Sequence, residues 1–178
     1  MWLSRYRFVA LPTHGNSGSR AYSIWMEHVV VRQAESKDVP EVAELFHYLW
    51  PKASLAEHTK ELVALLAGNS PGTFPIVVFL AEDCGRIVGF IEVDLRSHAD
   101  GCDPSRPTGY IEGWYVEPPY RRRRVGATLV AAAEDWARKQ GCTEMASDAW
   151  LDSVDSQRAH EALGFEVVDR CVHYRKDL

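Results

Sequence analysis

Four consecutive arginines, Arg121–Arg124, stand between a segment rich in strand-forming residues at 109–116 and a long stretch of helical periodicity that begins at Val125. This order predicts a strand, a turn and a helix N-terminus. Backbone N–H groups at a helix start are unpaired, the helix dipole favours negative charge there, and arginine donates charge-assisted hydrogen bonds to phosphate oxygens. The pattern predicts a diphosphate-binding turn, although the arginine run alone also fits a solvated basic turn or a nucleic-acid contact.

Glu112 is a second candidate, because it interrupts an otherwise apolar strand in which an unpaired carboxylate is costly to bury. Further acids fall in predicted loops and at strand ends, namely Asp100, Asp103, Asp148, Asp152, Asp155 and Asp169. Several carboxylates with few cations would attract a molecule that carries several ammonium groups. Any one of these acids is otherwise a solvated loop charge, and Asp152 and Asp155 would equally serve as helix caps.

The charge balance of the 178-residue chain fits a cationic partner. Its formal net charge is -5, and residues 26–178 hold 17 basic against 25 acidic residues, a net of -8. We therefore expect no general affinity for nucleic acid. No apolar run approaches the roughly 20 residues of a spanning helix, so we expect no membrane association. The cysteines and histidines show no metal-ligand spacing, which predicts no metal site and reduced thiols in a cytoplasmic protein.

Residues 1–25 are expected to be an N-terminal extension that is dispensable for the domain at residues 26–178. Their best apolar run is stopped by Pro12, so they do not form a secretory signal, and Met26 stands just before the first predicted strand. An upstream translation start would explain such a segment. Its aromatic residues leave open that it packs on the domain.

The hydrophobic pattern around these candidates predicts a single domain. Segments of β-branched or alternating residues predict strands at 28–32, 74–82, 86–94, 109–116, 144–147 and 165–174. Apolar residues at helical spacing predict helices at 36–49, 55–67, 125–140 and 153–163. The resulting order βααβββαβαβ is an α/β (α+β) arrangement, a mixed central β-sheet with helices on both faces.

With these elements in place, residues 28–176 resemble the GNAT superfamily of acyl-CoA N-acetyltransferases. The superfamily signature Gln/Arg-x-x-Gly-x-Gly/Ala is matched around Arg121 and Gly126, with Arg124 where the first glycine is usual. A second shared element is a helix that ends in Leu-Gly-Phe, here residues 159–165, in which His160 replaces the usual tyrosine.

The superfamily resemblance implies a single GNAT-like domain that uses acetyl-CoA and no metal. It implies that the backbone of Tyr115, Val116 and Glu117 pairs with the pantetheine arm. It also implies that the pyrophosphate is held by Arg121, Arg122, Arg123, Arg124, Val125 and Gly126.

Within the superfamily, the chain is most similar to the aminoglycoside 6′-N-acetyltransferases that confer antibiotic resistance. The shared strings include residues 49–51, 141–148 and 160–165. This resemblance implies a homodimer. It also implies an aminoglycoside site formed by Trp50, His98, Glu112, Asp148, Ser153 and Asp169, in which His98 and Ser153 replace tyrosine and asparagine. Trp50 would otherwise be core packing, whereas an exposed aromatic face would pack on a sugar ring.

The same resemblance implies direct attack of the 6′-amine on acetyl-CoA, without an acyl-enzyme. The amine is protonated in water, so Glu112 or Asp148 would accept its proton directly or through a water molecule. The departing thiolate needs an acid, for which His160 is the first candidate and Tyr174 the second. His160 would otherwise be a helix residue packed under the sheet.

Two alternative functions stay open at this stage. One is an enzyme of the same fold that acts on a polyamine or a protein amine. The other is a non-catalytic acyl-CoA-binding module, because Arg124 and Ser153 replace residues that the superfamily pattern expects.

Overall fold

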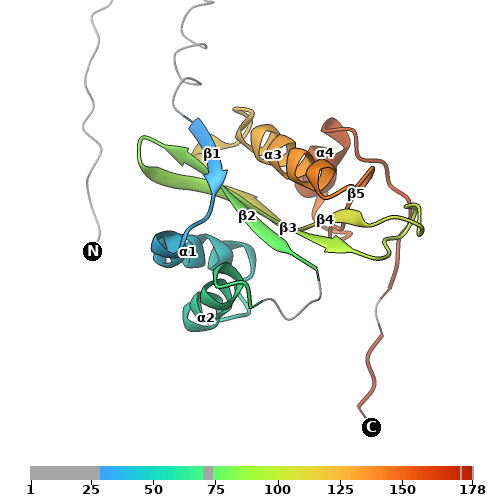
Figure 1. Cartoon of the computed structure of the whole chain (residues 1–178), viewed down its shortest axis with the longest axis horizontal. Coiled ribbons are helices and arrows are strands. Elements are labelled where there is room, and N and C mark those ends of the chain that lie inside the picture. The colour runs from blue at the N-terminus through green and yellow to red at the C-terminus, as the bar shows by residue number, and fades with distance from the viewer. Residues whose placement is uncertain (1–28, 70–73, 173, 178) are drawn as a thin grey trace, which may run out of the picture.

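A computed structural model describes residues 29–69, 74–172 and 174–177 of the chain, and Figure 1 shows how its helices and strands are arranged. The proposed N-terminal extension at residues 1–25 lies outside the described residues. Its dispensability therefore stays a prediction.

The centre of the fold is a five-stranded sheet in the order β1-β2-β3-β4-β5. The strands are β1 (Val29–Gln33), β2 (Ile76–Asp83), β3 (Arg86–Arg96), β4 (Thr108–Val116) and β5 (Met145–Ser147). The first four are antiparallel to their neighbours, whereas β5 runs parallel to β4, so the sheet is mixed as expected. The β2–β3 hairpin turns at Cys84 and Gly85, whose φ angles of 51° and 83° are those that a two-residue hairpin loop requires.

Helices cover both faces of the sheet, as the sequence predicts (Figure 1). Helices α1 (Val39–Leu49) and α2 (Leu55–Leu66) lie on one face, and α3 (Val125–Lys139) and α4 (Val154–Ala162) lie on the other. Ser54 caps α2, since its hydroxyl accepts from the Glu57 N–H while the Glu57 carboxylate accepts from the Ser54 N–H.

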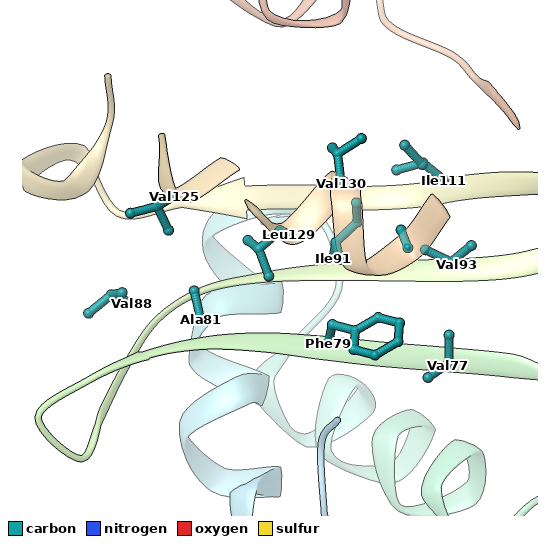
Figure 2. Packing of buried hydrophobic residues seen from close by; sticks show 11 residues of the cluster. Val77, Phe79, Ala81, Val88, Ile91, Val93, Ile111, Val125, Leu129 and Val130 are labelled. Atoms are coloured by element: carbon teal, nitrogen blue, oxygen red, sulfur yellow. The ribbon is translucent and has the colours of Figure 1, made fainter. Parts of the chain in front are cut away.

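The two faces of the sheet carry separate hydrophobic cores because side chains alternate along each strand. Val77, Phe79 and Ala81 of β2 pack with α3, whereas Val78 and Leu80 pack with α1 and α2. Figure 2 shows the first cluster, in which Leu129 and Val130 of α3 lie over Ile91 and Val93 of β3. The central strands are therefore buried on both sides and fix the positions of polar residues that interrupt them.

The strand predicted at residues 165–174 is wrong for the described part of this segment. Residues 165–172 and 174 form no regular secondary structure. Val167 and Val168 are exposed, and none of the strands in the described residues pairs with this segment. β-branched residues fit well in a strand that is already paired. They do not by themselves provide the neighbouring strand that pairing requires.

Candidate active site

A β-bulge brings several carboxylates together at the centre of the sheet. The pairing of β3 and β4 shifts between Glu92↔Gly113 and Val93↔Ile111, so Glu112 is the extra residue in β4. Because Ile91 and Val93 face α3, their neighbours Glu92 and Asp94 face the side of α1 and α2.

Glu92 and Asp94 are functional candidates that the sequence analysis missed. Glu92 is only 8% exposed. Its burial, together with the negative charges of Glu61, Glu112 and Asp94, raises its pKa to about 8. Burial and the neighbouring Glu112 carboxylate raise the pKa of Asp94 to about 6. Two acids at alternate positions of an otherwise apolar strand were the available signal, the same signal that drew attention to Glu112.

Arg96 joins these acids into a connected group that we call the Arg96 network, composed of Asp94, Arg96, Tyr110, Glu112 and Asp148. Arg96 Nε and Nη2 both donate to Glu112 Oε1, the first over 3.1 Å, and Nε lies 3.7 Å from Asp94 Oδ1. The guanidinium carbon lies 3.3 Å from the centroid of the Tyr110 ring. Tyr110 Oη donates to Asp148 Oδ1 over 3.2 Å. The network therefore links two of the predicted catalytic acids, Glu112 and Asp148.

Tyr110 is suited to its role as the donor in this network. Burial, followed by the negative charge of Asp148, raises its pKa to about 12. The phenol therefore keeps its proton at neutral pH and holds Asp148 by a hydrogen bond, while the Asp148 side chain itself stays exposed.

A cleft of about 840 Å³ opens beside this network, between residues 98–102, β5 with the residues that follow it, α4 and the C-terminal segment 165–171. Seven carboxylates and three guanidinium groups line the cleft, and two of those guanidinium groups, Arg96 and Arg138, are already paired with carboxylates. The cleft is therefore negatively charged and suited to a cationic ligand.

The structure brings four of the predicted site residues together on this cleft: His98, Asp148, His160 and Asp169. Glu112 does not line the cleft but is connected to it through Arg96. Ser153 precedes α4 as its N-cap residue and makes no side-chain capping bond. Tyr174 is 93% exposed and lies outside the cleft lining.

Trp50 packs against its neighbours, as one of the two interpretations considered for it expects, and its contact with a sugar ring stays a prediction. It ends α1, is half-buried and meets Phe46 edge to face with ring centroids 5.1 Å apart. A Cβ at Gly113 would lie 2.3 Å from its ring, so Trp50 packs directly on β4 next to the bulge at Glu112. His58 Nε2 lies 3.1 Å from the Trp50 carbonyl oxygen, which fixes the backbone of this residue.

His160 is held by hydrogen bonds at both ring nitrogens. Nδ1 lies 2.8 Å from the Ser156 carbonyl oxygen, and Nε2 lies 3.0 Å from Ser147 Oγ. The ring meets Trp114 and Phe165 edge to face, with centroids 5.5 Å and 5.4 Å apart. His160 thus packs against the sheet, as the alternative interpretation expected, and also lines the cleft.

The arginine turn, residues 121–124, carries exposed and unpaired positive charge. Among the described residues, none of the four arginines forms an ion pair with a carboxylate. Arg122 and Arg124 adopt left-handed φ angles of 60° and 63°, so Arg124 takes the backbone conformation for which glycine is usually selected. Arg121 Nε donates to the Val116 carbonyl oxygen over 2.8 Å, which ties the turn to the end of β4.

The start of α3 completes a site that fits a diphosphate. The first helical hydrogen bond runs from Thr128 N to Arg124 O, so the preceding N–H groups of the first turn lack helical acceptors. A Cβ at Gly126 would lie 2.5 Å from the Trp114 ring, so glycine lets the helix start approach β4 closely. Because Trp114 also meets the His160 ring, this single side chain lies between the start of α3 and a residue that lines the cleft.

The edge of β4 is open where the predicted pantetheine contacts fall. β5 pairs only with Gly109, Tyr110 and Ile111, so within the described part of the chain the rest of β4 has no strand neighbour on that side. Glu117 N–H donates to Val88 O, and its carboxylate binds Arg86, so Glu117 faces β3. Since N–H directions alternate along a strand, the Val116 N–H points toward the open edge and is the one best placed to pair with an extended ligand.

The described residues contain no group of three or more His, Cys, Asp or Glu side chains arranged to hold a metal ion. Within the same part of the chain, no helix is long and apolar enough to cross a membrane.

Comparisons with known proteins agree on one family. Residues 39–165 match the Acetyltransferase (GNAT) family. An "Aminoglycoside N(6')-acetyltransferase type 1" of Klebsiella aerogenes is 39% identical over 149 residues, which cover 84% of this chain and 97% of that protein. A protein of the same name from Serratia marcescens is 42% identical over 132 residues, which cover 73% of this chain and 86% of that protein.

Solved structures give the same result. AAC(6')-Iy in complex with the bisubstrate analogue CoA-S-monomethyl-acetylneamine superposes with a TM-score of 0.77 at 33% identity, covering 85% of this chain and all of that chain. The aminoglycoside 6'-N-acetyltransferase AAC(6')-IG from Acinetobacter haemolyticus superposes with a TM-score of 0.74 at 32% identity, covering 84% of this chain and 99% of that chain.

Proposed function

The chain belongs to the GNAT family of acetyltransferases, and from this premise we propose that it transfers the acetyl group of acetyl-CoA to the 6′-amine of aminoglycoside antibiotics. The observation that carries the proposal is the acid-lined cleft at the end of the β4–β5 pairing, where His160 meets Trp114, the side chain that packs on Gly126 at the start of α3. The polycationic aminoglycoside would be attracted to the acidic cleft, and the polyanionic acetyl-CoA would be attracted to the basic turn. The two substrates would then meet where these sites adjoin. Acetylation of the drug would confer resistance on the cell.

The donor site is the arginine turn together with the open edge of β4. The unpaired N–H groups at the start of α3 and the charges of Arg121–Arg124 suit a pyrophosphate. The N–H of Val116 suits an amide of the pantetheine arm. Acetyl-CoA bound in this way supplies the thioester that the amine attacks, and the residues of the donor site orient that thioester.

We assign the base to Asp148. It is exposed on the cleft, and its carboxylate accepts a hydrogen bond from Tyr110 but pairs with no cation among the described residues. Glu112 is less suited to take a proton because Arg96 already occupies one of its oxygens. Its role is then to hold Arg96, and through the Tyr110 ring to orient Asp148. Asp148 would accept the amine proton directly or through a water molecule.

We assign the acid to His160 in preference to Tyr174. His160 lies on the cleft and touches the Trp114 side chain that leads from the donor site. Tyr174 is almost fully exposed, and no contact places it near the cleft.

Substrate recognition would use the acids of the cleft, Asp169 among them, together with His98, which also lines it. Trp50, packed beside the bulge at Glu112, would offer an apolar surface to a sugar ring. Ser153, at the start of α4, would offer a hydroxyl in place of the amide that related enzymes carry.

We further propose that two copies form a homodimer in the cytoplasm, where acetyl-CoA is available. The C-terminal segment exposes Val167, Val168 and Val172, and among the described strands β5 pairs with β4 alone. A second copy would cover such a segment. Light scattering of the purified protein tests the dimer, and Val167→Lys with Val168→Lys should shift it toward the monomer.

The function is tested by thiol release from acetyl-CoA in the presence of different amines. We expect release with kanamycin or tobramycin at a rate well above that with spermidine or with a lysine-containing peptide. A preference for spermidine or for the peptide would favour the polyamine or protein-amine alternative. Binding of acetyl-CoA without release toward any amine would favour the non-catalytic module.

A further inference from the structure

The hydrogen bonds of His160 define which nitrogen carries a proton. The Ser156 carbonyl oxygen can only accept, so Nδ1 of His160, 2.8 Å away, must be the donor. In a neutral imidazole the other nitrogen, Nε2, is then an acceptor. Its partner is Ser147 Oγ at 3.0 Å, so the serine hydroxyl donates to the neutral ring.

The same partners also satisfy a protonated ring. If Nε2 carries a hydrogen, it donates to Ser147 Oγ, and the serine hydrogen is released toward another acceptor. The Ile111 carbonyl oxygen, 3.3 Å from Ser147 Oγ, is one such acceptor. A change in the protonation of His160 therefore reverses the direction of the Ser147 hydroxyl.

His160 itself cannot turn toward a ligand without breaking these contacts. Both nitrogens are occupied, and Trp114 and Phe165 hold the ring edge to face. Any proton that leaves Nε2 must therefore pass through the oxygen of Ser147.

Ser147 lies where a reacting group would be expected. It is the last residue of β5, and its pairing with Ile111 is the last pair before β4 and β5 separate. It precedes Asp148, the proposed base, and lines the cleft with it. Its hydroxyl thus contacts the His160 ring at the end of the β4–β5 pairing, next to the part of β4 to which we assign the pantetheine arm.

We infer that Ser147 relays a proton from His160 to the sulfur that leaves during acetyl transfer, an inference that rests on the proposed function. The bond between the amine nitrogen and the acetyl carbon forms, and the bond between that carbon and sulfur breaks. The sulfur keeps the electron pair and receives the Ser147 hydroxyl proton. Ser147 Oγ receives the proton from His160 Nε2, which leaves a neutral imidazole. The amine attacks in its neutral form, after its ammonium proton has been lost to water, and the proton that its nitrogen loses on becoming an amide goes to Asp148. Solvent then restores both groups.

The kinetic test compares Ser147→Ala, Ser147→Thr, His160→Gln and the Ser147→Ala/His160→Gln double variant, with Ser97→Ala as an exposed control. We expect Ser147→Ala to lower kcat about 100-fold while the KM for acetyl-CoA changes little. Ser147→Thr keeps the hydroxyl and should stay within about tenfold of wild type. In a relay, the double variant should be no slower than the slower single variant. Losses that multiply, or a wild-type kcat for Ser147→Ala, would overturn the relay.

A spectroscopic test needs neither substrate. In protein labelled with ¹⁵N-histidine, Ser147→Ala should shift the His160 Nε2 resonance and leave Nδ1 nearly unchanged, whereas Ser147→Thr should resemble wild type. An Nε2 resonance that does not shift in Ser147→Ala would refute the hydrogen bond and with it the relay.

The kinetic rates are measured with whichever amine the wild type acetylates. Absence of acetylation of every amine would reject the proposed function and the relay together, while the resonances would still report on the hydrogen bond.

Discussion

Arg96 donates from two of its guanidinium nitrogens to a single oxygen, Oε1, of Glu112. Glu112 is therefore already paired with a cation of the chain itself. An ammonium group of a substrate must share Glu112 with Arg96, whereas Asp148 offers a carboxylate that pairs with no cation among the described residues. This difference gives the two acids separate roles.

The Arg96–Glu112 pair should contribute measurably to stability. Arg96→Met leaves Glu112 beside Asp94 and Glu92 without its cation, and we expect a loss of about 1–2 kcal/mol in the free energy of unfolding. Arg96→Met combined with Glu112→Gln should recover part of that loss. Urea unfolding measures both. Arg138→Met, in an exposed pair with Glu134, is the control and should cost clearly less than Arg96→Met, because solvent screens this pair. Equal losses for Arg96→Met and Arg138→Met would contradict this role.

Glu92 should make the protein less stable as the pH rises. Its pKa is about 8 in the folded chain against an ordinary 4.5, so between these values the folded state holds a proton that the unfolded state has lost. The free energy of unfolding therefore decreases as the pH rises from 4.5 to 8. Above pH 8 Glu92 is ionised in both states, and its destabilising effect no longer grows. Glu92→Gln removes the penalty, and at pH 8.5 it should melt roughly 3 °C or more above wild type. A melting temperature equal to or below that of wild type at pH 8.5 would contradict the burial argument.

Asp148→Asn should lower turnover on aminoglycosides by about 10² to 10⁴ while acetyl-CoA binding stays nearly intact, because this acid faces the amine and not the phosphates. Glu112→Gln should also lower turnover, with a smaller loss, since Glu112 acts through Arg96. Steady-state rates and calorimetric titration with acetyl-CoA measure the two properties. Asp155→Asn, an exposed acid in the first turn of α4, is the control. Wild-type turnover in Asp148→Asn would remove this residue from the mechanism.

The left-handed backbone of Arg124 should carry a strain that glycine relieves. Arg124→Gly keeps the turn and should raise the free energy of unfolding by about 1 kcal/mol, because an L-residue at φ 63° pays a steric cost that glycine does not. Arg123→Gly removes the same charge at a position without a positive φ and should lower stability instead. Thermal unfolding of both variants at one salt concentration measures these changes. A stability of Arg124→Gly below that of wild type would argue against the strained turn.

Aminoglycoside affinity should fall steeply with added salt, because the acids of the cleft attract a polycation through interactions that mobile ions screen over about 8 Å at physiological ionic strength. Trp50→Ala should weaken binding by a similar factor at every salt concentration, since apolar contact with a sugar ring is not screened. Calorimetric titration of tobramycin at low and high salt measures both effects. A salt-independent affinity would contradict binding of the drug by the acids of the cleft. An unchanged affinity in Trp50→Ala would mean that Trp50 has a packing role only.

Local signals in the sequence were sufficient for most of the fold. Helical spacing and turn residues placed α1 to α4, and β-branched runs placed the five strands, each within a few residues. The strand predicted at 165–174 failed because pairing depends on a distant partner that local propensity does not reveal. The alternation of acids at Glu92 and Asp94 was visible, but only the sheet shows that both face the side of Glu112.

The contacts within the candidate site were not predictable in the same way. The bulge at Glu112 and the register that places Arg96 on Glu112 are set by pairing between strands, not by residue type. The partnership of His160 and Ser147 joins α4 to β5 across 13 positions and depends on how the helix packs. Residue types predicted which groups could act, and the fold determined which of them meet.

The most direct measurement of the central claim is acetylation of two aminoglycosides that differ only at the reacting group. Neomycin carries an amine at the 6′ position, and paromomycin carries a hydroxyl there. With acetyl-CoA labelled with ¹³C in the acetyl group, we expect rapid formation of a singly acetylated neomycin in which NMR locates the labelled acetyl group on the 6′ nitrogen, and almost no product from paromomycin. Acetylation of both compounds at equal rates, or a label at another amine of neomycin, would contradict it.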